Sequence, residues 1–123
     1  MTTTAEVLRQ DRWAVLVIVR NGRCAAADFI DALPLRSQKK LLRRIERVAA
    51  SENGPFDLKD EQKFKRLEEG LFELKSDQVR LLMFVDSPHR AVITHGFLKK
   101  TRQTPPVEVA RGRMLRDEYR REQ

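Results

Sequence analysis

Three apolar segments follow one another closely in the second half of this 123-residue chain, and they constrain its fold more than any other feature. Residues 71–75, 79–85 and 91–98 each have the composition of a β-strand, and only Ser76-Asp77 and residues 86–89 separate them. Connections this short join antiparallel neighbours, because a parallel crossover needs a dozen or more residues. The sequence therefore predicts an antiparallel meander at the centre of the fold.

The first half of the chain predicts one more strand and two helices. Residues 13–19 (WAVLVIV) form an almost continuous apolar run, which is typical of a strand buried on both faces, and Asn21-Gly22 ends it as a turn. The alanine-rich residues 23–33 predict a short helix, and residues 35–50 predict a longer one. The apolar stripe of the longer helix repeats at helical spacing and consists of Leu41, Leu42, Ile45, Val48 and Ala49.

The two ends of the chain and its middle segment are polar. We expect residues 1–12 to be a flexible N-terminal tail and residues 13–123 to form a single domain, because a chain of this length suits one domain. Residues 51–69 predict a polar connection. Thr104-Pro105-Pro106 predicts the start of a last helix, with Thr104 as its N-cap. The apolar stripe of that helix is thin and consists of Val107, Ala110 and Met114.

The chain is strongly basic. Its 25 Lys and Arg residues outnumber 18 Asp and Glu residues, which gives a formal net charge of +7 and a pI of about 10.1. Such a domain favours a polyanionic partner, because each neutralised phosphate releases a counterion; a soluble protein with a basic surface is the alternative. The longer helix carries four cations opposite its apolar stripe, and they form either an RNA contact or a solvated face: Lys40, Arg43, Arg44 and Arg47.

The composition also argues against several kinds of site and location. One cysteine, Cys24, and two histidines cannot build a standard zinc site, so we expect no metal and no cofactor. No apolar run approaches the roughly 20 residues that a membrane span requires. The N-terminus lacks the basic and apolar regions of a signal peptide. We therefore expect a cytoplasmic protein without a membrane partner.

Strand parity places three polar residues together, because side chains alternate between the two faces of a sheet. A two-residue turn at Ser76-Asp77 puts Glu73 opposite Arg80, and a four-residue loop at residues 86–89 puts His95 opposite Arg80. These three side chains then form a row on the less apolar face of the sheet. A one-residue slip in either turn would move part of the row to the other face.

Such a row suits RNA cleavage without a metal ion. Attack of the 2′-hydroxyl on the adjacent phosphate needs a base, a cation for the charge that builds on phosphorus, and an acid for the leaving 5′-oxygen. Arg80 can bind the phosphate, and His95 can donate or accept a proton near neutral pH. Lys75 lies on the same face and can act as a base, because neighbouring cations lower the pKa of a lysine. The structural alternatives are an ordinary Glu73–Arg80 cross-strand pair and a histidine without a catalytic role.

A longer pattern extends over residues 64–113. It contains Lys65-Arg66-Leu67, then GLFELK at residues 70–75, VRLLMF at 79–84, HGFLKKT at 95–101 and TPPVEVA at 104–110. In order and spacing these motifs resemble the HigB branch of the RelE toxin superfamily, the group of phage-derived toxin-like proteins. Phe84-Val85 departs from the pattern, because many members have an aromatic pair that includes tyrosine there.

The resemblance implies an α+β, RelE-like fold with a small antiparallel sheet, two N-terminal helices on one face and a C-terminal helix. It implies the toxin of a type II toxin–antitoxin system, an endoribonuclease that cleaves mRNA on the ribosome and blocks translation. The implied partners are a cognate helix-turn-helix antitoxin, the ribosome with its mRNA, and operator DNA reached through the antitoxin. The alternative is a non-catalytic nucleic-acid-binding protein or a partner protein in a repressor complex.

Carried over by position, the resemblance gives two groups of candidate site residues. The catalytic candidates are Lys75, Arg80, His95 and Lys99. The RNA-binding candidates are Lys65, Arg66, Glu73, Phe97, Lys100 and Arg102. As structural alternatives, Lys99 and Lys100 are surface charges at the end of a strand, and Phe97 is a core residue.

Overall fold

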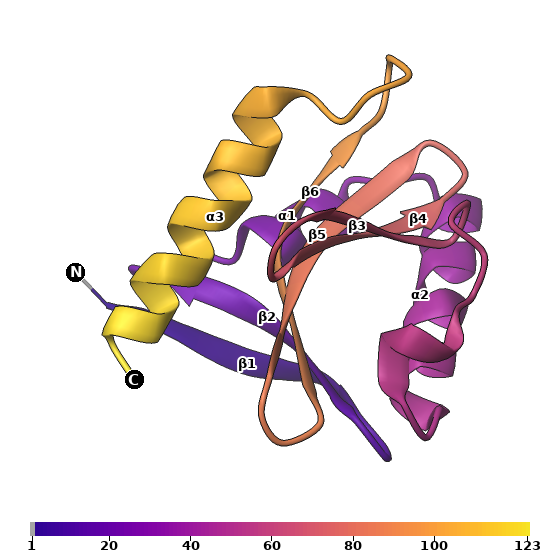
Figure 1. Ribbon diagram of the computed structural model, residues 1–123. Helices are drawn as coiled ribbons and strands as arrows, with labels where there is room; N and C mark the ends of the chain where they lie inside the picture. The colour runs from indigo at the N-terminus through magenta and orange to yellow at the C-terminus, as the bar shows by residue number, and fades with distance from the viewer. Residues whose placement is uncertain (1) are drawn as a thin grey trace.

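The computed structural model describes residues 2–123, in which three α-helices pack on a six-stranded mixed sheet (Figure 1). The strands lie side by side in the order β1-β2-β6-β5-β4-β3. Their bounds are β1 Thr3–Gln10, β2 Ala14–Arg20, β3 Phe64–Glu68, β4 Leu71–Ser76, β5 Val79–Asp86 and β6 Arg90–Leu98. The helices are α1 Ala25–Asp31, α2 Leu35–Ala50 and α3 Pro106–Arg121, together with a short 3-10 helix, η1, at Gly54–Asp57. Within residues 2–123, no helix has the length and apolar character needed to cross a membrane.

The predicted arrangement of two N-terminal helices on an antiparallel sheet is wrong. The chain first forms β1 and β2, and α1 and α2 then connect them to the remaining strands. β2 pairs with β6 in parallel, with Ala14 opposite Arg90 and Val17 opposite Ile93, so the sheet is mixed. The apolar run of β2 explains this position, because a strand that is apolar on both faces requires cover on both.

Two strands lie where the sequence predicts none. β1 falls in the segment that we expected to be a flexible tail, and it pairs antiparallel with β2. β3 falls in the expected polar connection and pairs antiparallel with β4. Both are edge strands of the sheet, and most of the side chains of β1 are exposed. Neither strand therefore shows the apolar alternation that identifies a half-buried strand in a sequence.

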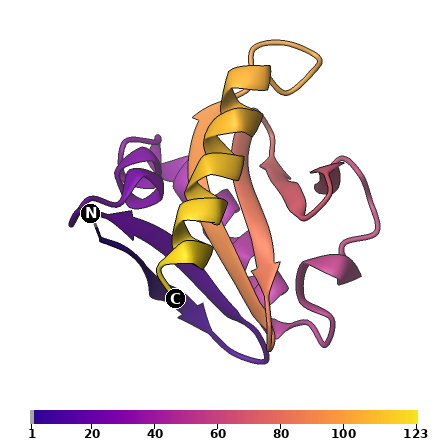
Figure 2. The same ribbon diagram turned by 60° about the vertical axis from the view of Figure 1, so that its left-hand side comes forward.

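Different helices cover the two faces of the sheet. α1 and α2 cover one face and bury the larger apolar cluster, which includes Val15, Ile45 and Leu81. α3 lies across the other face, where Figure 2 shows it running along β5 and β6. Most of the stripe predicted for α2 is buried, but Leu42 is exposed.

α3 packs through a different stripe from the predicted one. Val107 and Met114 lie outside the buried stripe, with 73% and 42% of their surface exposed, whereas Leu115 and Tyr119 are buried. The Tyr119 ring lies 5.7 Å from the ring of Phe84 on β5. Because α3 uses this inner stripe, its apolar residues Val107 and Met114 remain on the molecular surface.

The β4–β5 turn lies one residue later than predicted. It is formed by Asp77-Gln78, and Asp77 has the positive φ (52°) that is common in two-residue hairpin turns. Lys75, rather than Glu73, therefore lies opposite Arg80. The pairing changes by two residues, so every side chain stays on the face that parity assigned to it.

The pairing of β5 with β6 differs from the predicted register in two ways, and the two differences cancel each other in the face that His95 occupies. The connecting loop is one residue shorter than predicted, and this change by itself would move each side chain of β6 to the other face of the sheet. A bulge next to Leu82 adds one residue to β6, so the side chains beyond the bulge return to the predicted face. His95 therefore lies on the predicted face, but it is opposite Leu82, and Arg80 is opposite Phe97.

Candidate active site

Five cations converge on a cavity of about 280 Å³ where β3, β4 and the segment after β6 meet. We call it the cationic cavity, and its basic residues are Lys65, Arg66, Lys75, Lys99 and Arg102. β3 contributes two of them, β4 contributes Lys75, and the segment between β6 and α3 contributes the other two. A concave surface with this charge is suited to phosphate groups.

Glu73, which lines the cationic cavity, forms a buried polar pair with Arg80 beside it. The Glu73 carboxylate is 1% exposed and accepts a hydrogen bond from Thr104 Oγ1 at 2.6 Å, and Arg80 Nε lies 3.6 Å from Glu73 Oε1. Arg80 also donates from Nη1 to the carbonyl oxygens of Asp77 and Val79. Burial lowers the pKa of Arg80 and Glu73 opposes the change, but a guanidinium stays charged in proteins. Contacts within the protein therefore fix the position of the Arg80 guanidinium.

Lys75 is half-buried among other cations. Burial is the largest cause that lowers the pKa of its ammonium group. Neighbouring cations lower this pKa further and the Glu73 carboxylate opposes them; the cations are Arg80, Lys99 and Lys65. A lysine with a lowered pKa gives up its proton more readily, so Lys75 can act as a general base. The sequence predicted this direction from the cations, and the structure adds burial as the larger cause.

His95 is fully buried beneath α3 and lies outside the cationic cavity. Its Nδ1 is 3.0 Å from Thr94 Oγ1, and its Nε2 is 3.3 Å from Glu108 Oε1 on α3. Burial, and to a smaller extent the charge of Arg111, lowers the pKa of His95 to about 4. The imidazole is therefore neutral at neutral pH, and its contact with Glu108 is a hydrogen bond rather than an ion pair.

The structure brings together most of the predicted site residues. Six of them line the cationic cavity: Lys65, Arg66, Glu73, Lys75, Lys99 and Arg102. Arg80 lies beside it, and Lys100 is exposed outside it. His95 and Phe97 are stacked under α3, and Phe97 belongs to the core there. The predicted row of three polar residues does not form, because Leu82 lies between Glu73 and His95, and Arg80 lies between Lys75 and Phe97. Among residues 2–123, no group of three or more His, Cys, Asp or Glu side chains is placed to hold a metal ion.

Four residues that line the cationic cavity were not predicted as part of the site: Leu67, Gln103, Thr104 and Val109. We expected Thr104 to cap the last helix, but Pro105 occupies the cap position of α3, and the Thr104 hydroxyl binds Glu73. The two prolines were a signal for a fixed chain direction, because proline restricts φ. No feature of the sequence showed which side chain the hydroxyl would meet.

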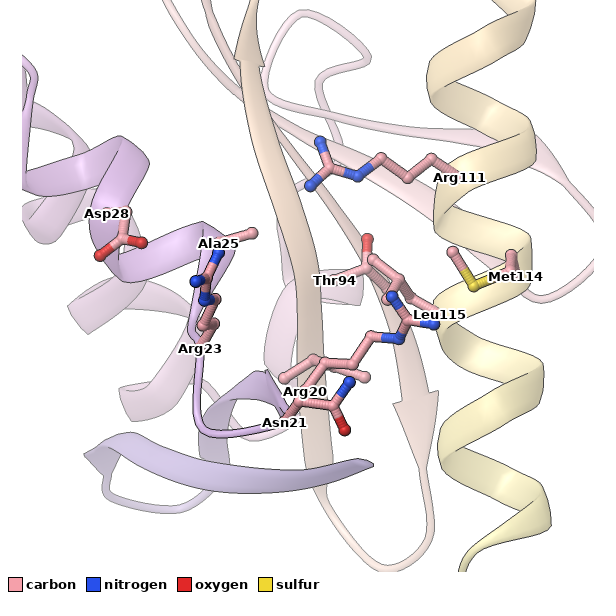
Figure 3. Close-up of a pocket in the computed structure, with 10 residues that line it drawn as sticks. Arg20, Asn21, Arg23, Ala25, Asp28, Thr94, Arg111, Met114 and Leu115 are labelled. Atoms are coloured by element: carbon pink, nitrogen blue, oxygen red, sulfur yellow. The ribbon is translucent and has the colours of Figure 1, made fainter. Parts of the chain in front are cut away.

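A larger cavity of about 620 Å³ lies between α1, the end of β2 and α3 (Figure 3). Arg20, Arg23 and Arg111 line it, and Arg20 Nε forms an ion pair with Glu118 Oε1 at 2.9 Å. None of the predicted site residues lines this cavity. We place the candidate active site in the cationic cavity, because it combines several cations with a lysine of lowered pKa.

Comparison with known protein families shows a match over residues 28–116 to the family described as Phage derived protein Gp49-like (DUF891), which is toxin-like. The matched segment is more than half of the chain and contains every predicted site residue. A comparison with curated proteins gives no significant match.

Proposed function

The chain belongs to the Gp49-like family of phage-derived, toxin-like proteins, and on this premise we propose that it is the toxin of a type II toxin–antitoxin system. Within that class we propose a HigB-like toxin of the RelE superfamily, a metal-independent endoribonuclease that cleaves mRNA on the ribosome. A toxin-like family suggests an antitoxin partner in general. We propose that the cognate antitoxin has a helix-turn-helix domain and connects the toxin to operator DNA.

The observation that carries the proposal is a half-buried lysine of lowered pKa surrounded by phosphate-binding cations. Lys75 shares the cationic cavity with Lys65, Arg66, Lys99 and Arg102. These cations can hold a phosphodiester while Lys75 reaches the neighbouring sugar. Cleavage that uses the 2′-hydroxyl acts on RNA and not on DNA, because only RNA has that group.

In the proposed reaction, neutral Lys75 takes the proton of the 2′-hydroxyl as the 2′-oxygen forms its bond to phosphorus. The bond between phosphorus and the 5′-oxygen breaks, and the Lys99 ammonium donates a proton to that oxygen. The products are a 2′,3′-cyclic phosphate and a 5′-hydroxyl end. Lys65 and Arg102 stabilise the negative charge on the phosphoryl oxygens in the transition state. Arg80 lies opposite Lys75 and positions it, and burial together with the charge of Arg80 keeps the pKa of Lys75 low.

The catalytic role of His95 stays a prediction. In this conformation α3 covers the imidazole and Glu108 binds its Nε2. Catalysis through His95 therefore requires α3 to move away from β6. The same condition applies to Phe97 as a platform for RNA bases, because its ring is buried in the same place.

Growth arrest on expression tests the proposal. The wild-type protein should stop growth and create new mRNA 5′ ends, and Lys75→Ala should slow cleavage at least ~100-fold, the lower end of a general base's contribution. Lys59→Ala is the matched control, because it removes the same charge from an exposed position outside the cavity. Circular dichroism should show the same fold for both variants. A Lys75→Ala protein that arrests growth and cuts mRNA like the wild type would exclude Lys75 as the base.

A non-catalytic nucleic-acid-binding protein, for example a subunit of a repressor complex, is the second candidate. The burial of His95 favours it, because the cationic cavity then offers phosphate-binding groups without an imidazole. This candidate predicts salt-dependent binding to nucleic acid without growth arrest or new mRNA ends. Mapping mRNA ends after expression of the wild-type protein therefore separates the two candidates.

A further inference from the structure

A second basic surface lies on α2, away from the cationic cavity. It is a groove of about 480 Å³, which we call the α2 groove, and its basic residues are Arg36, Lys40, Arg43, Arg44, Arg47 and Lys63. Leu58 is the remaining lining residue, so within the described chain no carboxylate lines the groove. Six cations without an acidic neighbour in the lining make a site for a polyanion.

The helical repeat explains how these cations come together. Arg36, Lys40, Arg43 and Arg47 recur at intervals of three and four residues, which places them on one side of α2. The opposite side of α2 buries Leu41, Ile45, Val48 and Ala49. From residue 36 to residue 47 the cations extend over about 16 Å of helix, because each residue adds about 1.5 Å. Like charges at this spacing repel one another, and a bound polyanion relieves that repulsion.

The α2 groove is connected to the candidate active site. Lys40, Arg44 and Lys63 also line a neighbouring cavity of about 380 Å³, and Lys75 and Arg80 line its other side. Lys75 in turn lines the cationic cavity. Three adjoining cavities thus form one path from the catalytic candidates to α2. Asp60 and Asp77 line the middle of this path, and Asp77 Oδ2 binds Lys40 Nζ at 2.8 Å, so the positive charge is least balanced at the α2 end.

We propose that the α2 groove binds the phosphate backbone of the single-stranded RNA that continues from the cleavage site, an inference that rests on the proposed function. The lining chemistry favours RNA over a protein partner, because a stable protein interface needs buried apolar or aromatic anchors and the groove offers only Leu58. Arg44 also lines the groove, and its Nη1 is buried without a hydrogen-bond partner, so this donor is unsatisfied in the free protein. Contacts to phosphates do not distinguish bases, so the groove adds affinity without sequence preference.

Fluorescence-anisotropy titration of a labelled single-stranded RNA at several salt concentrations tests this proposal. The parent protein carries Lys75→Ala, so that little RNA is cut during the titration. Adding Arg43→Ala and Arg47→Ala should weaken binding about tenfold and reduce the log–log salt slope by about 1.4, since each phosphate contact of a single strand contributes about 0.7. Adding Arg43→Lys and Arg47→Lys should leave the slope unchanged, because lysine preserves the charge.

Arg9→Ala with Arg12→Ala is the matched control. Both residues are exposed and lie at β1 and the turn after it, and the pair removes the same two charges. This control should retain the affinity and the salt slope of the parent protein. Equal losses in both pairs would overturn the proposal, because the effect would then come from net charge. It would also be overturned if the α2 groove variant bound RNA like the parent but lost binding to the purified antitoxin.

The titration separates the failure of this proposal from the failure of the proposed function. If the wild-type protein creates no mRNA ends but the α2 groove variant binds RNA weakly, the proposal for the groove is supported and the proposal of cleavage is wrong. If the wild-type protein cuts mRNA and the groove variant binds RNA like its parent, the proposal of cleavage is supported and the groove proposal is wrong.

Discussion

The two faces of the sheet are buried in different ways. Under α1 and α2 the buried side chains are mainly apolar, and Ile45 and Leu81 are typical of them. Under α3, polar and charged side chains are buried as well, among them Glu73, Arg80 and His95. Burying such groups costs stability unless they are paired, and these three contact Thr104, the β4–β5 turn and Glu108, respectively. The α1–α2 face therefore stabilises the fold, whereas the α3 face combines stability with titratable groups.

The largest expected effect is on the apolar face. Leu81→Ala removes a side chain with no exposed surface and should lower the free energy of unfolding by about 2–5 kcal/mol, measured by urea denaturation. The loss should be the same at pH 4 and pH 7, because nothing titratable is removed. Leu98→Ala, at a half-exposed position near the end of β6, is the control and should cost much less. A loss below about 1 kcal/mol for Leu81→Ala would contradict tight packing on this face.

The next effect should appear on the α3 face as a dependence of stability on pH. The pKa of His95 is about 4 in the folded protein, below the usual 6.5, so the unfolded chain binds more protons between these values. The stabilisation is complete above pH 6.5 and is lost as the pH falls towards 4. Its size is up to about 3 kcal/mol, since each pKa unit corresponds to about 1.4 kcal/mol.

Urea denaturation between pH 4 and pH 7 measures this effect. His95→Gln should remove that part of the pH dependence, whereas carboxylates that titrate in the same range remain in every variant. His89→Gln is the control, because His89 is exposed in the β5–β6 loop. If His89→Gln and His95→Gln change the pH dependence equally, the burial of His95 is not its cause.

Local signals predicted the elements whose own residues determine their structure. α2 has the predicted bounds, and β4, β5 and β6 agree with the prediction within one residue at each end. β1 and β3 could not be predicted in this way, because they are polar edge strands that depend on their neighbours. The parallel pairing of β2 with β6 joins residues far apart in the sequence, and no local pattern specifies it.

The candidate site could likewise be predicted only where it depends on local sequence signals. Lys75 lies in β4 and Lys99 directly follows β6, and local signals placed both of these strands correctly. Lys65 and Arg66 lie on β3, which no local signal predicted. The burial of His95 could not be predicted, because it depends on how α3 packs against β6. The amphipathic signal of α3 was misleading, since its buried side includes Gly112 and Glu118 while Val107 is exposed. A Cβ at Gly112 would lie 3.1 Å from Leu82, so the absence of a side chain there lets the helix approach the sheet.

Glu73→Gln has the smallest expected effect on stability, and it links the buried α3 face to the proposed chemistry. The amide still accepts the hydrogen bond of Thr104 Oγ1 but offers no charge to Arg80 Nε, so we expect the free energy of unfolding to fall by about 1–2 kcal/mol.

The Glu73 carboxylate raises the pKa of Lys75, so its removal lowers that pKa further. Because neutral Lys75 is the proposed base, the rising limb of the cleavage rate against pH should move to lower pH. Glu69→Gln removes the same charge from a side chain that is almost fully exposed and should leave the limb in place. If the limb does not move in Glu73→Gln, or moves equally in both variants, the cleavage rate does not depend on the protonation of Lys75.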